Sequence, residues 1–168
     1  SHSFPTRRSS DLGSSLSLNK EDYCSVGNFA STVGNRVEID NPFKKTSVIN
    51  NFEIEVPIYF YSTSSYSQCV METGPISGDF LGFKLMITDL EKPRALVSLQ
   101  DGTNLSLVVT TTLTTDKKYF MRLTYDENTG YTLYLKDISE GASWSVEASS
   151  SITTGLVSTA DYLLFGYD

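Results

Sequence analysis

The chain has 168 residues, of which 39% are hydrophobic, and a formal net charge of −7 at pH 7. This length suits one domain with a single core. The negative charge argues against nucleic acid or an anionic membrane as a partner, and no apolar run is long enough to span a bilayer.

The first twelve residues show neither strand or helix periodicity nor the apolar core of a signal peptide. One reverse translation of residues 2–12 looks like a widely used short-read sequencing adapter, so we predict a non-native scar over residues 1–12. A disordered basic tail is the alternative. We predict an N-terminal lead-in over residues 13–26 and one domain over 27–168, truncated at its C-terminus.

The scar would contain His2, which is the only histidine of the chain. Without it, Ser-His and Cys-His nucleophile pairs and imidazole metal sites lose their central group. Without Arg7, Arg8 and Asp11, the 13 basic and 20 acidic residues become 11 and 19, which gives a net charge of −8.

From residue 36 onward, apolar and polar residues alternate, and Gly, Asn, Asp and Pro separate the runs. This pattern is typical of short β-strands joined by turns. The clearest strand covers residues 52–61, with Glu53, Glu55, Tyr59 and Tyr61 on the face opposite to its apolar residues. Pro57 has no N–H to donate, so we expect this strand at a sheet edge or with a bulge.

Further strands are predicted over residues 67–72, 80–88, 95–99, 104–110, 117–126, 130–136, 143–148 and 162–166. The strands over 117–126 and 130–136 form a hairpin whose turn ends on Gly130, a residue that tolerates positive φ. The pattern predicts an all-β fold, an antiparallel two-sheet β-sandwich or jelly roll.

The predicted hairpin resembles one that recurs in concanavalin A-like and laminin G-like domains. An aromatic residue opens its first strand, Tyr125 and Asp126 precede the turn, and the return strand carries Leu133, Tyr134 and Leu135. Segments 35–43, 52–56 and 162–166 are similar to other strands of such domains. The resemblance implies a concanavalin A-like sandwich that lacks its last strand.

Some members of this superfamily are glycoside hydrolases with carboxylates at alternate positions of one strand. Glu38 with Asp40, and Glu53 with Glu55, match this pattern in part, but neither pair has a third carboxylate. Such pairs are common on solvent-facing strands, so we expect no enzymatic activity.

We expect no cofactor, with calcium left open. Legume-lectin metal sites use a histidine in their best-known pattern, and laminin G-like domains bind calcium with fewer side chains. Asp79, Asp101 and Asp126 are candidates, although turn aspartates usually cap their own backbone. Cys24 and Cys69 form a disulfide or stay buried as small apolar residues.

Sugar recognition requires aromatic faces with polar groups beside them. The predicted ligand-binding residues are Glu53, Glu55, Tyr59, Tyr61, Arg122 and Trp144. The alternatives are that the tyrosines only cover a sheet, that Trp144 belongs to the core, and that Arg122 pairs with a glutamate across strands.

The segment Asn41-Pro42-Phe43 and the pair Phe165-Gly166 also resemble domains of phage tail and bacterial surface proteins. Together these resemblances imply a non-catalytic carbohydrate-binding or surface-recognition domain of a phage tail or bacterial surface protein. We expect it on a cell surface, on a virion or otherwise outside the cell, within a larger multidomain or trimeric fibre protein. Its partner would be a glycan or surface polymer, with no nucleic acid and no membrane insertion. The alternatives are a structural or protein-docking module and a fragment of a glycoside hydrolase.

Overall fold

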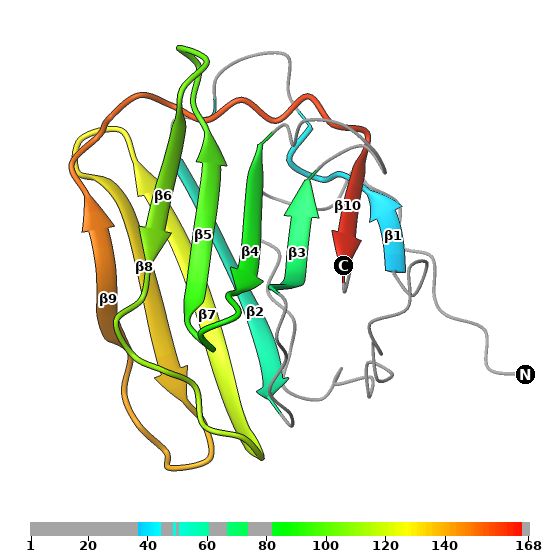
Figure 1. Cartoon of the computed structure of the whole chain (residues 1–168). Helices are drawn as coiled ribbons and strands as arrows, with labels where there is room; N and C mark the ends of the chain where they lie inside the picture. Colours follow the sequence, from blue (N-terminus) through cyan, green and yellow to red (C-terminus); the bar gives the residue numbers. More distant parts are fainter. Residues whose placement is uncertain (1–36, 45–48, 50, 61–66, 74–81, 166–168) are drawn as a thin grey trace, which may run out of the picture.

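Ten strands make up most of the chain that the computed structural model describes, residues 37–44, 49, 51–60, 67–73 and 82–165. They form two antiparallel sheets that face each other (Figure 1). This arrangement confirms the predicted all-β sandwich. No helix in the described ranges is long and apolar enough to cross a membrane.

The larger sheet has six strands and the smaller one four. The order in the larger sheet is β1 (Val37–Asp40), β10 (Tyr162–Phe165), β3 (Gln68–Thr73), β4 (Phe83–Ile87), β5 (Pro93–Ser98) and β6 (Asn104–Val108). The order in the smaller sheet is β2 (Asn51–Phe60), β7 (Lys117–Asp126), β8 (Gly130–Asp137) and β9 (Ser145–Ser150).

The core lies between the sheets and is built by the alternation that the sequence shows. In β2, Phe52, Ile54 and Val56 are buried, whereas Glu53 is exposed and Glu55 is partly exposed. The inward residues of β7 and β8 are buried in the same way. Each large apolar side chain removed from water contributes about 1.5–3 kcal/mol, so this alternation fixes which face of each strand points inward.

Strand β2 lies at an edge of the smaller sheet, which confirms the first of the two alternatives predicted from Pro57, an edge position or a bulge. It pairs with β7 along ten residues, from Asn51 opposite Asp126 to Phe60 opposite Lys117. The predicted β7–β8 hairpin is also present, with Gly130 at a φ of 91°. The register of β8 with β9 shifts between Leu133 and Tyr134.

Some predicted strand ends are wrong. Strand β9 begins at Ser145, so Trp144 precedes the strand instead of lying in it. Strand β5 begins at Pro93 and β6 ends at Val108. The N–H of Val109 still donates to the carbonyl of Pro93, but Pro93 has no N–H to donate in return. The predicted scar and lead-in and Cys24 lie outside the described residues, and the missing last strand stays a prediction.

The segment after β9 crosses one end of the sandwich to reach β10 in the other sheet (Figure 1). Its Leu156 is fully buried and forms isolated bridges with Ile49 and Leu99. This crossing therefore closes the core at that end.

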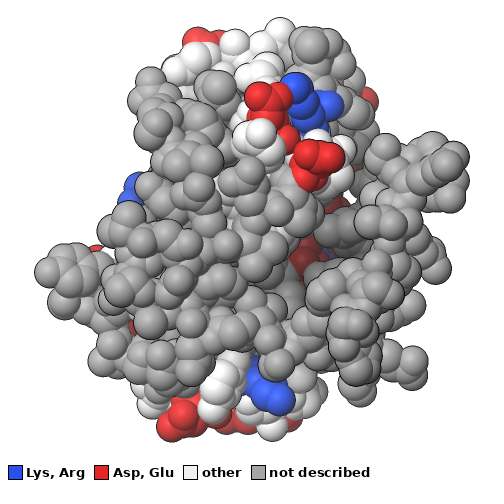
Figure 2. All heavy atoms as spheres, turned by 90° about the vertical axis from the view of Figure 1, so that its right-hand side faces the viewer, with Lys and Arg blue, Asp and Glu red and all other residues white. Residues whose placement is uncertain are grey.

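Charges of both signs are mixed on the side of the molecule that β1 borders. Figure 2 shows described basic side chains next to described acidic ones toward both ends of this side. Lys44 and Asp161, which lie next to strands of the larger sheet, form one such ion pair.

Gly130→Ala should destabilise the fold more than Gly102→Ala. Both glycines have positive φ, but a Cβ at Gly130 would lie 2.1 Å from the carbonyl oxygen of Ser150, whereas one at Gly102 meets nothing within 4 Å. We expect about 1–3 kcal/mol from backbone strain at Gly102, and about 2–6 kcal/mol from strain and overpacking together at Gly130. Urea denaturation of both variants measures this difference in the free energy of unfolding. Equal losses of stability in the two variants would contradict the close approach of β9 to Gly130.

Candidate functional site

Three aromatic and four charged side chains gather on the outer face of the smaller sheet. We call this cluster the Trp144 patch; it consists of Glu53, Glu55, Phe120, Arg122, Tyr134, Lys136 and Trp144. The strand register brings its members together, since Arg122 lies opposite Glu55 on one side and Tyr134 on the other. Phe120 lies opposite Lys136 in the neighbouring row.

Arg122 is the centre of the patch. Its Nη2 and Nε donate to Oε2 of Glu55 at 3.0 and 3.2 Å, and its Nε lies 3.7 Å from Oε1 of Glu53. The guanidinium carbon lies 4.0 Å from the ring centroid of Trp144 and 6.0 Å from that of Tyr134. Both glutamates therefore hold the guanidinium in place against the indole.

Trp144 lies on the sheet surface and is partly exposed, so the core alternative for this residue is wrong. Its ring centroid is 6.2 Å from that of Phe120 and 6.5 Å from that of Tyr134. The ammonium of Lys136 lies 5.9 Å from the same ring and makes no ion pair with another described residue. The patch thus combines the indole of Trp144 with two cations. The charge of Arg122 is balanced by Glu53 and Glu55, whereas no described carboxylate forms an ion pair with Lys136.

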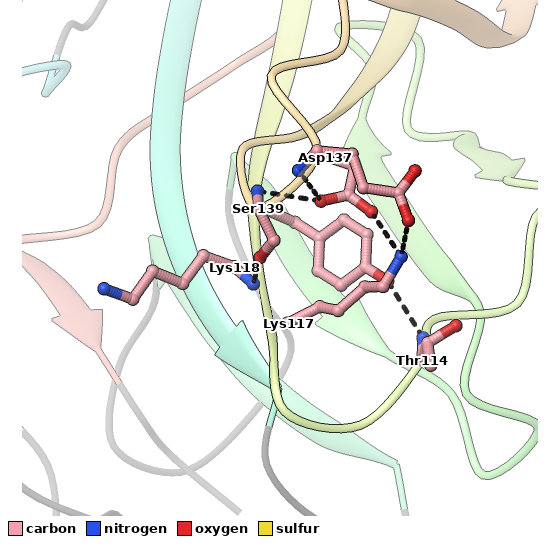
Figure 3. Close-up of polar contacts among 7 residues, drawn as sticks. Thr114, Lys117, Lys118, Asp137 and Ser139 are labelled. Carbon is pink, nitrogen blue, oxygen red and sulfur yellow. Dashed lines mark hydrogen bonds and ion pairs between the residues drawn. The ribbon is translucent and has the colours of Figure 1, made fainter.

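A polar network positions the turn that leads to Trp144 (Figure 3). Asp137 accepts the N–H of Ser139 at 2.9 Å and that of Glu140 at 3.3 Å through Oδ1. Its Oδ2 accepts from the ammonium of Lys117 at 3.0 Å, and Lys117 also pairs with Glu140.

These contacts stabilise the cation and tie the turn to β7. Hydrogen bonds to Glu140, and then to Asp137, raise the pKa of Lys117. The hydroxyl of Ser139 accepts the N–H of Lys118 at 2.8 Å. The turn that leads to Trp144 is therefore anchored to the first two residues of β7.

The structure brings four of the six predicted ligand-binding residues together: Glu53, Glu55, Arg122 and Trp144. Tyr59 is 57% exposed but lies toward the other end of β2, with its hydroxyl 3.4 Å from Asp116.

Tyr61 lies outside the described residues. Sequence reasoning missed Phe120, Tyr134 and Lys136, although the alternation of β7 and β8 places them on the same outer face as Arg122.

One of the two predicted carboxylate pairs interacts with an arginine. Glu53 and Glu55 both interact with Arg122, which confirms the cross-strand alternative for that arginine. Asp40 is exposed, and the side chain of Glu38 is not described.

Two of the three calcium candidates cap their own turns. Asp101 accepts from the N–H and hydroxyl of Thr103, and these hydrogen bonds lower its pKa. Asp126 accepts from the N–H groups of Asn128 and Thr129. Asp79 lies outside the described residues, and the described ranges contain no group of three or more metal-ligating side chains.

No protein-family model matches this chain, and no curated protein matches its sequence. Among solved structures it is similar to the crystal structure of a mutant of HCR/D, with a TM-score of 0.56 and 15% identity over 79% of this chain and 32% of that one.

It is also similar to two botulinum neurotoxin domains. The serotype D ligand-binding domain in complex with N-acetylneuraminic acid gives a TM-score of 0.49 and 15% identity over 81% of this chain and 36% of that one. The type G receptor-binding domain gives a TM-score of 0.43 and 12% identity over 81% of this chain and 40% of that one. The chain thus spans well under half of each matched structure, and at these identities the likeness shows the fold alone.

Asp137→Ala should loosen the turn before Trp144. The substitution removes the acceptor for two N–H groups and one partner of Lys117. A loss of about 1–2 kcal/mol would speed amide exchange in residues 138–142 about 5- to 30-fold. Hydrogen exchange measures this effect, and Asp89→Ala, at an exposed turn, is the control. Unchanged exchange in Asp137→Ala would refute the anchoring role.

Arg122→Ala should change the fluorescence of Trp144, which is the only tryptophan of the chain. Loss of the guanidinium uncovers the ring, so we expect a red-shifted emission, stronger quenching by acrylamide and a stability loss of about 1–2 kcal/mol. Arg94→Ala, on the larger sheet, removes a hydrogen bond to Ser106 and should leave the emission unchanged. An unaltered spectrum in Arg122→Ala would contradict the stacking.

Proposed function

We propose that this chain is a non-catalytic recognition domain of the concanavalin A-like superfamily that binds a glycan or surface polymer through the Trp144 patch. The observation that supports this most is the position of Trp144. A large ring that could fill the core lies on the outside of the sheet, beside charged side chains.

The chemistry of the patch suits a sugar. The apolar side of a pyranose can stack on an aromatic ring, while neighbouring polar groups hydrogen-bond its hydroxyls. Lys136 supplies donors, and the carboxylates of Glu53 and Glu55 supply acceptors beyond those that Arg122 uses. The contacts within the patch hold these groups in one geometry, which reduces the entropic cost of binding.

We further propose that the domain works on a cell surface, on a virion or otherwise outside the cell, as one part of a larger protein such as a phage tail or bacterial surface protein. The net charge of −7 is compatible with a polysaccharide partner and unfavourable for nucleic acid.

Trp144→Ala should abolish the array binding of at least one glycan that the wild type binds. An aromatic residue at the centre of a site contributes about 2 kcal/mol or more, so the dissociation constant should rise at least about 30-fold. Tyr162→Ala is the matched control, because Tyr162 is an aromatic residue with 38% exposure on the other sheet.

If Trp144→Ala bound every glycan that the wild type binds, each with unchanged affinity, this assignment of the site would be overturned. If the folded wild type bound no glycan on the array, the structural or protein-docking alternative would be favoured instead.

A further inference from the structure

A shallow groove of about 520 Å³, wide open to solvent, lies at the end of the sandwich that the segment after β9 crosses. Three chain segments meet there: the β5–β6 turn, the β7–β8 turn and the crossing segment (Figure 1). We call it the end groove. The residues that line it are Gln100, Tyr125, Glu127, Asn128, Thr153, Thr154 and Gly155. We propose that the end groove is a second binding site, distinct from the Trp144 patch, for a neutral, hydroxyl-rich ligand such as an oligosaccharide.

The floor of the end groove is rigid. The rings of Tyr125 and Tyr131 stack with centroids 4.2 Å apart and an interplanar angle of 22°. Their hydroxyls donate to the carbonyls of Thr153 at 2.7 Å and Thr154 at 2.9 Å. Burial raises the pKa of both phenols, so both remain protonated donors and hold the crossing segment in place.

The main chain of the walls is also held in place. The N–H of Gln100 donates to the carbonyl of Gly155 at 2.9 Å, which joins the β5–β6 turn to the crossing segment. The N–H of Asn128 donates to the carboxylate of Asp126 at 2.8 Å, which fixes the β7–β8 turn. A ligand would thus meet a largely preorganised backbone.

The side chains along the walls keep their polar groups available. Within the described residues, no hydrogen bond uses the side chain of Gln100, Glu127, Asn128, Thr153 or Thr154. Each amide offers both donors and an acceptor, and each hydroxyl offers one donor and acceptor lone pairs. This set matches vicinal sugar hydroxyls, which also donate and accept.

The charge of the end groove favours a neutral ligand. Glu127 is the one charged side chain of its lining, so an anionic ligand would be repelled. The site is also separate from the Trp144 patch, because β8 runs between Asn128 and the turn before Trp144. The indole of Trp144 packs beside Tyr134, which is four residues along β8 from Gly130. Four strand residues span roughly 13 Å, too far for one pyranose to touch both the indole and the β7–β8 turn.

Titration of the ¹⁵N-labelled chain with maltohexaose, cellohexaose and xylohexaose tests the proposal. At least one probe should shift the backbone amides of Gln100, Asn128 and Thr154 in a saturable way. Asn128→Ala should weaken this binding at least about tenfold, because it removes an amide but keeps the N–H that caps the turn. Asn104→Ala, at an exposed asparagine of β6, is the matched control.

Two further measurements make the test specific to the end groove. Trp144→Ala should leave the titration of the end groove unchanged, so that failure of one site is distinguishable from failure of the other. Hexagalacturonate should bind the wild type more weakly than the neutral probes, and Glu127→Gln should reduce that difference. The proposal is overturned if no neutral probe shifts these amides at millimolar concentration, or if Asn128→Ala binds as the wild type does.

Discussion

The ten-residue pairing of β2 with β7 is the constraint on which both the core and the candidate site depend. Once Ile54 lies opposite Leu123 in the interior, Glu55 must lie opposite Arg122 on the outside. A slip of one residue would turn the apolar face of β2 to solvent and the glutamates toward the core. Hydrophobic burial therefore sets the register, and the register then assembles the ion pair at the centre of the Trp144 patch.

Much of the fold could be predicted from the sequence, because the patterns that specify the strands and turns lie within short segments of the chain. Alternation in residues 52–61 gave the inward face of β2, Pro57 gave its edge position, and Gly130 marked the hairpin turn. Strand ends were less predictable, because hydrogen bonds between distant segments decide them. Strand β6, for example, ends one residue before Val109, whose ladder partner Pro93 has no N–H to donate in return.

The candidate site could be predicted only where alternation decides which way a side chain points. That reasoning placed Glu53, Glu55 and Arg122 on one face. The position of Trp144 depends on a turn held by Lys117 and Asp137, which are 20 residues apart, and no local pattern reveals that contact. The end groove was not predicted either, since three turns and loops far apart in the sequence form it.

Because the chain has one tryptophan, its indole N–H gives a single resonance that reports on the Trp144 patch alone. The most direct test of glycan recognition at this patch is to follow that resonance in the Asn128→Ala variant, whose end groove is weakened, while a glycan that this variant binds on an array is titrated in. The account predicts a saturable shift with the same dissociation constant as overall binding. Saturable binding to this variant that leaves the indole resonance unmoved would contradict it.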